Sequence, residues 1–346
     1  MINNRKFEHI NILTSKNEID KSSQYKYFDQ IKLINRALPE LDLSEIDTSI
    51  DFLGYKLSMP LIISSMTGGK GKIFTTINQN LAIAAAKTNV AFSVGSQRIM
   101  KYEPLANKSF DIKNITKNIP VISNLGAVQL NYELNLKDIE YFSDFINADG
   151  IYFHCNPLQE AIQLEGNTNF KNIISKISDI SNNIKLPIIL KEVGCGISTY
   201  DIELGLKNGI KYFDLSGSGG TSWSLVEYIR SSRNSKSQNQ SLGYNFQDWG
   251  IPTLKALQDS KKYRNQALFI ASGGIRNGID IAKSIILGAS LVGIAKPFLH
   301  AAQKSSEEVI ELIQFLQKEL KISMFLMGIK NLSELFGNES LILKNN

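Results

Sequence analysis

Short apolar runs alternate with helical patterns along most of the chain. The runs lie at residues 61–66, 90–95, 120–125, 150–154, 187–193, 212–216, 268–272 and 291–295. Nearly continuous apolar strands of this kind are typical of a parallel sheet that is buried on both faces. Eight such strands with helices between them predict an α/β protein with a (β/α)8 TIM barrel. The alternative is a doubly wound open sheet, which would show fewer strands and a single switch-point motif.

Several segments fall outside this repeat. Residues 1–50 are polar and broken, so we expect an N-terminal arm or cap over the barrel mouth, with a short helix at residues 28–37. A strand or hairpin at residues 51–54 then leads into a single barrel domain, residues 51–346. This domain includes C-terminal helices, because residues 307–320 have the apolar spacing of an amphipathic helix. The polar stretch at residues 231–241 predicts a mobile loop around 224–250, which is either a lid or a surface decoration.

Composition places the chain among ordinary globular proteins. It has 346 residues, of which 43% are hydrophobic and 21% charged, and a net charge of +5. The mild positive charge suits an anionic small molecule, and the lack of a Lys/Arg block argues against nucleic acid. Two cysteines make no disulfide framework. Since no apolar segment resembles a signal peptide or reaches the ~20 residues that span a bilayer, we expect a cytoplasmic protein without a membrane partner.

Glycine, serine and threonine are concentrated directly after the last three predicted strands. The segments are GSGGTS at residues 217–222, GGIR at 273–276 and AKP at 295–297. Backbone N–H groups in such loops approach a phosphate closely, and the last two strands of this barrel carry its customary phosphate site. One Gly-Gly pair would be a weak signal, but three adjacent loops favour a ligand that bears a phosphate.

The fourth predicted strand ends in a dense set of polar residues. Its apolar residues 151–153 are followed by His154, Asn156, Gln159 and Glu160. Side chains at the carboxyl ends of barrel strands face the active site, so these residues are candidates for binding a ligand. Glu160 is a candidate for holding Mg²⁺ together with phosphate oxygens. The simpler interpretation is a strand end followed by a helix start, with Pro157 in the first turn.

Lys191 is the single lysine that ends a buried predicted strand. It suits a Schiff-base lysine, a group that stabilises negative charge on a flavin, or one half of an ion pair with Glu192 or another carboxylate. Most other strand ends supply Ser, Thr, Asn and Gln, which match the hydrogen-bonding edges of a flat heteroaromatic ring such as a flavin.

A second anion site is suggested by basic residues near the N-terminus and after the second strand. Arg5, Lys6 and His9 are close in sequence, and Arg98 directly follows Ser96 and Gln97. A guanidinium in that position can clamp a phosphate with two hydrogen bonds. Arg5 and Lys6 alone would also fit a solvated tail.

Taken in order, these strand ends resemble the type 2 isopentenyl diphosphate isomerases, an FMN-dependent family. The matching segments are RKFEH at residues 5–9, MTGG at 66–69, GSQR at 95–98, NLGAVQ at 124–129, HCN at 154–156, QE at 159–160, KEVG at 191–194, SGGTSW at 218–223, DWGIPT at 248–253 and ASGGIR at 271–276. No single segment is unique to the family, but the ordered set is specific. The polar insert at residues 231–241 is the least similar part.

The resemblance implies a reaction and a set of ligands. The reaction is the interconversion of isopentenyl and dimethylallyl diphosphate by a 1,3-allylic proton shift in isoprenoid biosynthesis. The cofactors are reduced FMN, NADPH as the reductant, and Mg²⁺ on the diphosphate. The family also tends to form homo-oligomers, namely tetramers or octamers.

The resemblance further implies roles for individual residues. FMN contacts are expected from Ser65, Met66, Thr67, Ser96, Asn124, Lys191, Ser216, Thr221, Gly273, Gly274, Ala295 and Lys296. Substrate contacts are expected from Arg5, Lys6, Ser96, Gln97, Arg98, His154, Asn156 and Gln159. Glu160 is the expected Mg²⁺ ligand. Catalytic roles are expected of Lys191, His154, Gln159 and Glu227, where Glu227 and Gln159 are candidates to relay protons beside flavin N5; Glu227 would otherwise be a solvated helix carboxylate.

Two other classes of function are weaker. An FMN-dependent oxidoreductase of the 2-hydroxyacid oxidase type needs a His base in the loop after the sixth strand, and residues 217–221 contain none. A flavin-binding or phosphate-binding protein without catalysis would not need Lys191, His154, Gln159 and Glu160 together.

Overall fold

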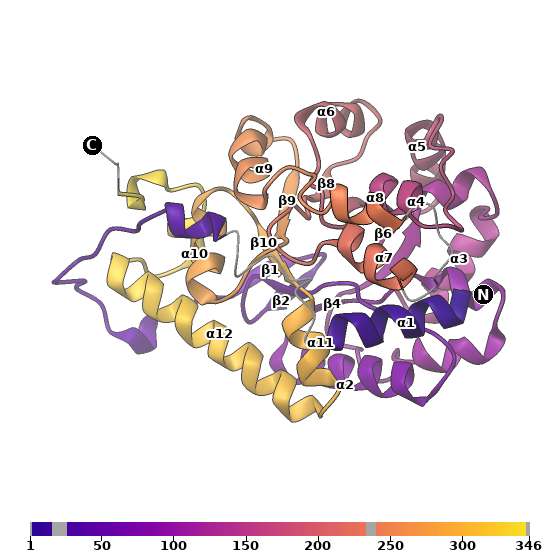
Figure 1. The fold of residues 1–346 in the computed structure, drawn as a ribbon. Coiled ribbons are helices and arrows are strands. Elements are labelled where there is room, and N and C mark those ends of the chain that lie inside the picture. The colour runs from indigo at the N-terminus through magenta and orange to yellow at the C-terminus, as the bar shows by residue number, and fades with distance from the viewer. Residues whose placement is uncertain (1, 16–25, 233–239, 344–346) are drawn as a thin grey trace.

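A closed parallel barrel forms the centre of the protein (Figure 1). The computed structural model describes residues 2–15, 26–232 and 240–343. The barrel strands follow the order β10-β3-β4-β5-β6-β7-β8-β9. They are β3 (Leu61–Ile63), β4 (Ala91–Ser93), β5 (Val121–Gly126), β6 (Gly150–Cys155), β7 (Ile188–Glu192), β8 (Tyr212–Asp214), β9 (Leu268–Ser272) and β10 (Leu291–Ile294). The predicted TIM barrel is therefore confirmed, and the open-sheet alternative is excluded.

Helices surround the barrel, as Figure 1 shows. Those between and after the strands are α2 (Lys72–Thr88), α3 (Leu136–Phe145), α4 (Pro157–Ile162), α5 (Ile173–Asn183), α6 (Thr199–Lys207), α7 (Trp223–Ser232), α8 (Gln240–Asn245), α9 (Thr253–Ser260), α10 (Gly278–Ile286) and α11 (Lys296–Ala302). The C-terminal pair is α12 (Ser306–Met327) and α13 (Leu332–Leu335). The amphipathic helix predicted at residues 307–320 is confirmed as part of α12, which packs on α2, α10 and α11.

Side chains inside the barrel form two layers of opposite character. The lower layer is Ile62, Ala91, Ile122, Tyr152, Ile189, Tyr212, Ile270 and Leu291, which pack together as one apolar cluster. Successive residues of a strand point to opposite faces, so the position two residues later also points inward. Those positions are Ser64, Ser93, Asn124, His154, Lys191, Asp214, Ser272 and Gly293. The apolar layer fills the lower part of the barrel. The layer above it lies at the barrel mouth, and we call it the floor.

A β-hairpin closes the apolar end of the barrel. Strands β1 (Ile50–Phe52) and β2 (Tyr55–Leu57) pair antiparallel through a turn in which Leu53 and Gly54 both have positive φ. Phe52 and Leu57 pack against the apolar layer. The hairpin predicted around residues 51–54 is confirmed, and it plugs the end of the barrel opposite the polar layer.

The N-terminal segment differs from its prediction in two respects. Residues expected to be an irregular arm form helix α1 (Ile2–Thr14), which packs on α7 and α11. The short helix predicted at residues 28–37 is wrong: only a 3-10 turn, η1 (Tyr27–Gln30), is present. The backbone after η1 instead bonds to the C-terminal segment, since the N–H of Ile34 donates to the carbonyl of Leu341 and that of Leu343 to the carbonyl of Lys32. These tertiary bonds replace the helical ones.

The long interval between β8 and β9 also contains more regular structure than expected. Helices α7 and α8 occupy much of the range 224–250 where a loop was predicted. Side chains of α7 explain the difference, because Leu225 and Val226 are buried against Ile12 of α1. Residues 233–239 lie outside the described residues, and the mobility of this segment stays a prediction.

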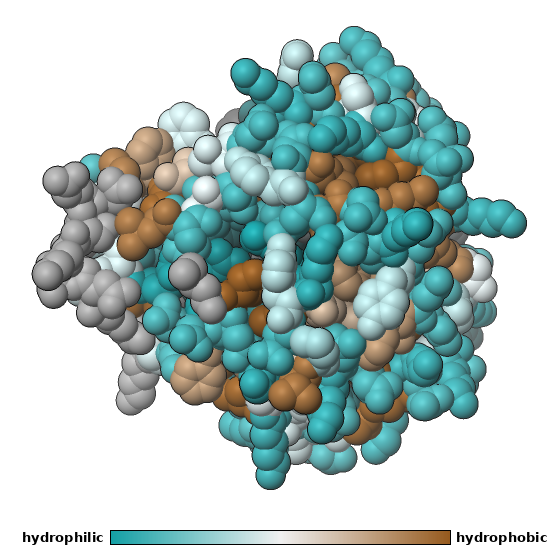
Figure 2. Space-filling model, turned by 90° about the vertical axis from the view of Figure 1, so that its right-hand side faces the viewer, coloured by the Kyte–Doolittle hydropathy of each residue, from teal (hydrophilic) through white to brown (hydrophobic). Residues whose placement is uncertain are grey.

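The face shown in Figure 2 is largely hydrophilic, with patches of hydrophobic side chains. Among the exposed large hydrophobic residues are Tyr102, Leu105 and Tyr141. None of the helices in the described part of the chain has both the length and the apolar character needed to cross a bilayer.

Candidate active site

A cavity of about 500 Å³ opens at the polar end of the barrel. Barrel-strand ends form its lower part, and α1 contributes Arg5, Lys6 and His9 from above. Every residue to which the sequence analysis assigned a site role lines this cavity except Gln97 and Glu227. The structure therefore brings together residues that are up to almost three hundred positions apart in the chain, such as Arg5 and Lys296.

Gln97 is directed away from the cavity. Its amide nitrogen donates to the carbonyl of Phe142 at 2.7 Å, and its amide oxygen accepts a hydrogen bond from the Ser123 hydroxyl at 2.6 Å. The side chain is completely buried. Because both ends of the amide are used inside the barrel wall, the predicted substrate contact from this side chain is not supported.

The cavity floor holds a neutral histidine. His154 Nδ1 lies 2.8 Å from Asn124 Oδ1, so Nδ1 carries the proton and Nε2 is left as an acceptor. Burial lowers the pKa of His154 to about 3, with further lowering from the positive charges of Lys191 and Lys6. The imidazole is consequently uncharged at neutral pH, and it offers a hydrogen-bond acceptor rather than a cation.

Lys191 is the floor's cation, and its partner is Asp214. The ammonium nitrogen lies 3.0 Å from Asp214 Oδ2, and both side chains are almost fully buried. Strand register explains the contact, since Lys191 of β7 pairs with Asp214 of β8. Lys191 therefore forms its ion pair with Asp214 of the neighbouring strand, and not with Glu192, which the sequence had also offered as a partner.

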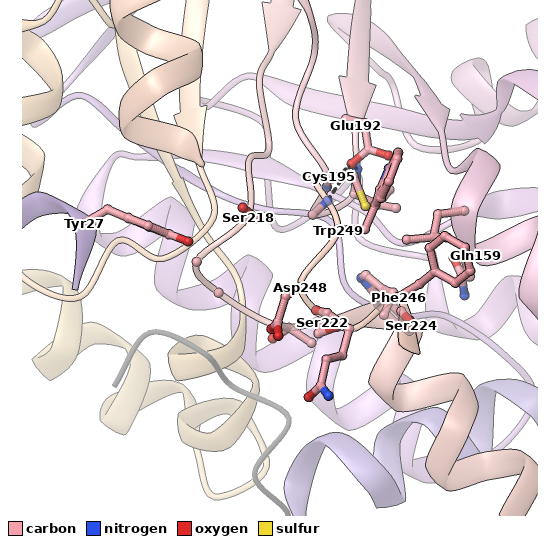
Figure 3. Close-up of a pocket in the computed structure, with 18 residues that line it drawn as sticks. Tyr27, Gln159, Glu192, Cys195, Ser218, Ser222, Ser224, Phe246, Asp248 and Trp249 are labelled. Carbon is pink, nitrogen blue, oxygen red and sulfur yellow. Dashed lines mark hydrogen bonds between the residues drawn. The ribbon is translucent and has the colours of Figure 1, made fainter. Parts of the chain in front are cut away.

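Glu192 faces the opposite side of β7, toward a separate small cavity (Figure 3). Its carboxylate accepts hydrogen bonds from the backbone N–H groups of Val193, Gly194 and Cys195. Burial raises the pKa of Glu192 to about 7, against the lowering effect of these bonds. Burial also raises the pKa of the Cys195 thiol to about 12, and the negative charge of Glu192 is a second, smaller cause of this rise. Cys195 is thus an unreactive thiol, which argues against a nucleophilic role.

Three basic residues gather on the roof side of the cavity. Lys6 Nζ donates to the carbonyl of Ser96 at 2.7 Å, Arg5 Nη1 donates to Gln163 Oε1 at 3.2 Å, and Arg98 forms an ion pair with Glu133. Burial lowers the pKa of Lys6 to about 7, and the charges of Arg5 and Arg98 lower it further. The mutual repulsion of these cations is relieved when an anion binds between them.

Glu160 is held beside these cations by neutral donors. Its Oε1 accepts a hydrogen bond from Asn156 Nδ2 at 3.1 Å, and its Oε2 accepts from Gln163 Nε2 and the Asn167 backbone, both at 2.6 Å. No group of three or more His, Cys, Asp or Glu side chains that could hold a metal ion occurs in the described parts of the chain. Glu160 therefore fits a divalent cation whose other ligands are substrate oxygens and water, as is common for Mg²⁺.

Glu227 lies just behind the cavity wall. Its Oε1 is 3.0 Å from His9 Nε2 and accepts a hydrogen bond from Gln159 Nε2 at 3.1 Å, while its Oε2 accepts from Arg230 Nε at 2.7 Å. Burial alone would raise its pKa, but His9, Arg230 and Gln159 together lower the pKa of Glu227 to about 2. Glu227 is thus a buried anion that reaches the cavity through His9 and Gln159, and not a solvated helix carboxylate.

Glycine-rich loops close the side of the cavity formed by β8, β9 and β10. Gly273 and Gly274 have φ of +96° and +76°. A Cβ on Gly273 would lie 2.1 Å from the Gly217 carbonyl oxygen, and one on Gly274 would lie 2.6 Å from that of Gly219. Only glycine permits this packing, which leaves backbone N–H groups at the cavity surface.

The donor set fits a flavin with a phosphate. The Ser64 hydroxyl lines the cavity and is buried without a hydrogen bond among the described residues, as is Asn156 Oδ1. Neutral amides and hydroxyls on the floor can hydrogen-bond to the polar edge of a flavin's isoalloxazine ring. The backbone N–H groups of the glycine loops can bind the flavin's phosphate.

Gln163, Arg276 and Ser64 are among the cavity-lining polar residues that were not assigned a role from sequence. Gln163 stands one helical turn after Glu160, a spacing that could have identified it. Arg276 ends the ASGGIR segment and is held by Asp280 and Asp29, with Nε 2.8 Å from Asp280 Oδ2. Ser64 precedes Ser65 on the same strand end. Only the two-residue periodicity of the barrel interior distinguishes Ser64 as a floor residue.

Comparison with known proteins identifies the family of this chain. The family model for FMN-dependent dehydrogenases matches residues 2–122 and 157–343. Isopentenyl-diphosphate delta-isomerase of Hydrogenovibrio crunogenus is 47% identical, over 99% of this chain and 98% of that protein. The enzymes of the same name from Paracoccus zeaxanthinifaciens and Rickettsia akari are 47% and 41% identical, over 98% and 96% of this chain and 96% and 95% of those proteins.

Solved structures share the fold at low sequence identity. A flavocytochrome b2 variant with sulfite bound superimposes with a TM-score of 0.70 at 17% identity, over 97% of this chain and 82% of that one. A mandelate oxidase variant gives a TM-score of 0.67 at 18% identity, over 96% and 94% of the two chains. The family model covers most of the chain, and the isopentenyl-diphosphate delta-isomerases named above are up to 47% identical to it over nearly its whole length. The chain therefore belongs to the FMN-dependent dehydrogenase family and, within it, to the isopentenyl-diphosphate delta-isomerases.

Proposed function

We propose that this protein interconverts isopentenyl diphosphate and dimethylallyl diphosphate by a 1,3-allylic proton shift, using reduced FMN and Mg²⁺. One observation carries the proposal: the cavity joins a floor of amides, hydroxyls and the Lys191–Asp214 ion pair to a roof of three cations beside the Glu160 carboxylate. The identity of 47% to isopentenyl-diphosphate delta-isomerases over almost the full chain supports the same assignment.

The diphosphate is assigned to the roof. Arg5, Lys6 and Arg98 supply the positive charge, and Glu160 supplies one carboxylate oxygen to a Mg²⁺ that the diphosphate also binds. Asn156 supports Glu160 through its Nδ2 and has a buried Oδ1 without a hydrogen-bond partner among the residues that the structure describes. The hydrocarbon part then extends from the cations toward the floor and Trp223, which also lines the cavity.

FMN is assigned to the floor and the glycine loops. Ser65, Met66, Thr67, Ser96, Asn124, Lys191, Ser216 and Thr221 would hold the ring system, and Gly273, Gly274, Ala295 and Lys296 would hold the phosphate. Reduced FMN, when bound, supplies proton-transfer chemistry at a ring nitrogen. NADPH is the proposed reductant, needed to prepare the cofactor and not consumed with each turnover.

The chain's own groups account for proton movement at the far side of the substrate. Glu227 is anionic at neutral pH and accepts hydrogen bonds from His9 and Gln159, which both line the cavity. A proton leaving the allylic carbon can reach Glu227 through the His9 ring, which takes up a proton at one nitrogen and gives the proton of the other to the carboxylate, while the Gln159 amide holds the carboxylate in place. His154, being neutral, orients the substrate through Nε2 and does not add charge beside the cations.

We further propose that the enzyme works in the cytoplasm as a homo-oligomer of about four or eight chains, by similarity to its family. Two free cysteines suit a reducing compartment. Exposed Tyr102, Leu105 and Tyr141 offer apolar surface for contact between subunits.

The test is a direct turnover experiment. Protein loaded with FMN is reduced anaerobically with NADPH and given isopentenyl diphosphate and Mg²⁺. We expect dimethylallyl diphosphate to accumulate without net consumption of the reductant. Oxidation of one reductant per product would contradict the proposal and favour a 2-hydroxyacid oxidase type of chemistry, against which the absence of histidine at residues 217–221 already argues.

A further inference from the structure

The cavity floor contains one cation and one anion. Of its eight positions, seven are polar and one is glycine; Lys191 and Asp214 carry opposite formal charges, and His154 is neutral. Lys191 lines the cavity, whereas Asp214 does not and is completely buried. Asp214 is therefore a buried negative charge beneath the cavity, out of reach of a ligand bound there.

Contacts from the two neighbouring strands fix the position of Asp214. Its Oδ2 is 3.0 Å from Lys191 Nζ, and its Oδ1 accepts a hydrogen bond of 2.5 Å from the Ser272 hydroxyl of β9. The Tyr152 ring of β6 lies below, with its centroid 5.6 Å from Lys191 Nζ. The ammonium is thus held between a carboxylate and the face of an aromatic ring, two groups that attract a cation.

This arrangement offsets the lysine's charge. A buried ammonium without a partner would present its full charge to a ligand in a low-dielectric site. With Asp214 directly beside it, the pair is neutral as a whole and presents mainly its positive end to the cavity. A group bound above the floor consequently feels less positive potential than a single lysine would produce.

We propose that Asp214 is a positioning residue for the flavin site: it holds the Lys191 ammonium at the cavity floor and limits how strongly that charge favours the reduced cofactor. The inference rests on the proposed function, because it requires flavin above Lys191. A limit of this kind suits an isomerase, which must return the cofactor unchanged after every turnover.

The test compares the affinity of the protein for reduced and for oxidised FMN, together with the midpoint potential of the bound cofactor. For Asp214→Asn we expect the ratio of affinities to shift at least tenfold toward reduced FMN, which corresponds to 29.6 mV more positive for a two-electron couple. Lys191→Met should shift the ratio in the opposite direction. Asp214→Glu keeps the charge and should stay within about threefold of the native ratio.

Glu192→Gln is the matched control. It removes the carboxylate next to Lys191 in sequence, which faces the small cavity and is held by backbone N–H groups. All variants are measured about one pH unit above the Glu192 pKa of about 7, so that this carboxylate is mostly charged in the native protein. A structural role for Asp214 alone would weaken FMN binding in both oxidation states and leave the potential unchanged. An unchanged or more negative potential in Asp214→Asn, or an equal shift in Glu192→Gln, would overturn the proposal.

A paired substitution keeps the proposal testable when Asp214→Asn fails to fold. Lys191→Met combined with Asp214→Asn leaves no unpaired buried charge, so it is better tolerated than either loss alone. Its affinity ratio should return to within about threefold of the native value, whereas a ratio equal to that of Lys191→Met would overturn the proposal. Failure of the native protein to bind FMN would contradict the proposed function instead, which separates the two outcomes.

Discussion

The floor of the cavity is built from barrel strands, whereas its roof is built from α1, α4, α7 and the 3-10 turn η3 (Gln97–Lys101), which carries Arg98. Floor residues such as Asn124 and Lys191 are buried and fixed by ladder register to partners on adjacent strands. Roof residues are joined by side-chain ion pairs, for example Arg5 with Glu165 at 3.8 Å and Arg230 with Glu165 at 2.9 Å. The difference indicates a division of labour: a rigid floor suits a resident cofactor, and an ionic roof can rearrange around a charged substrate.

The largest effect is expected from removing the roof's buried anion. In Glu227→Gln the amide oxygen can still accept hydrogen bonds from His9 and Gln159, but the carboxylate that would accept a proton is removed. We expect kcat to fall about 10²-fold, the lower end of the usual contribution of a general base, because a pKa of about 2 makes Glu227 a weak base. FMN affinity should be unchanged, because Glu227 does not line the cavity. Loss of FMN binding in parallel with kcat would show that roof and floor are not separable.

A smaller loss is expected from removing one roof cation. Arg5→Met should raise the KM for isopentenyl diphosphate about tenfold to a hundredfold, since a hydrogen bond to a charged group contributes about 1.5–3 kcal/mol. Lys330→Met is the control, because Lys330 pairs with Glu45 at the exposed surface. Steady-state kinetics on both variants checks the prediction, which an unchanged KM in Arg5→Met would contradict.

Neutralising the proposed metal ligand should give an effect of about one order of magnitude. Glu160→Gln removes the carboxylate but retains an amide oxygen, so we expect about a tenfold higher Mg²⁺ concentration for half-maximal activity. FMN binding, followed by fluorescence titration, should stay as in the native protein. If flavin is lost instead, Glu160 belongs to the cofactor side of the site and the division proposed above is wrong.

The smallest effect is a dependence of substrate binding on pH. The pKa of Lys6 is lowered to about 7, so this side chain is charged below that pH and becomes neutral above it. Affinity for a non-reacting diphosphate should therefore weaken by about fivefold between pH 7 and pH 8, in step with the charged fraction of Lys6. Lys6→Met should flatten this profile over pH 6–8. A native profile that is already flat there would contradict a role for Lys6 as a titrating cation.

Much of the floor could be predicted from the sequence, and most of its chemistry follows from strand ends. Each apolar run predicts a barrel strand. Within a strand, the residue two positions after an inward-pointing apolar residue also points inward, so a polar residue there is predicted to lie on the floor. The pairing of Lys191 with Asp214 could not be derived in this way, because it depends on the register between β7 and β8.

The roof was harder to predict because its structure depends on tertiary contacts. Residues 2–14 have a weak helical pattern and no acidic residue in the first turn, yet they form α1 through the burial of Ile10 and Ile12. The same burial orders α7, whose Leu225 and Val226 pack against Ile12 where a loop was expected. Short helices of this kind are stabilised mainly by packing, which local sequence does not report.

The separation of floor and roof is tested most directly by a structure of the protein with reduced FMN, Mg²⁺ and isopentenyl diphosphate. We predict that the diphosphate contacts Arg5, Lys6 and Arg98 and shares its metal with Glu160. The flavin ring should lie on the floor beside Asn124 and Lys191, with its phosphate at Gly273 and Gly274. A diphosphate bound at the glycine loops, or a flavin ring among the roof cations, would contradict the account.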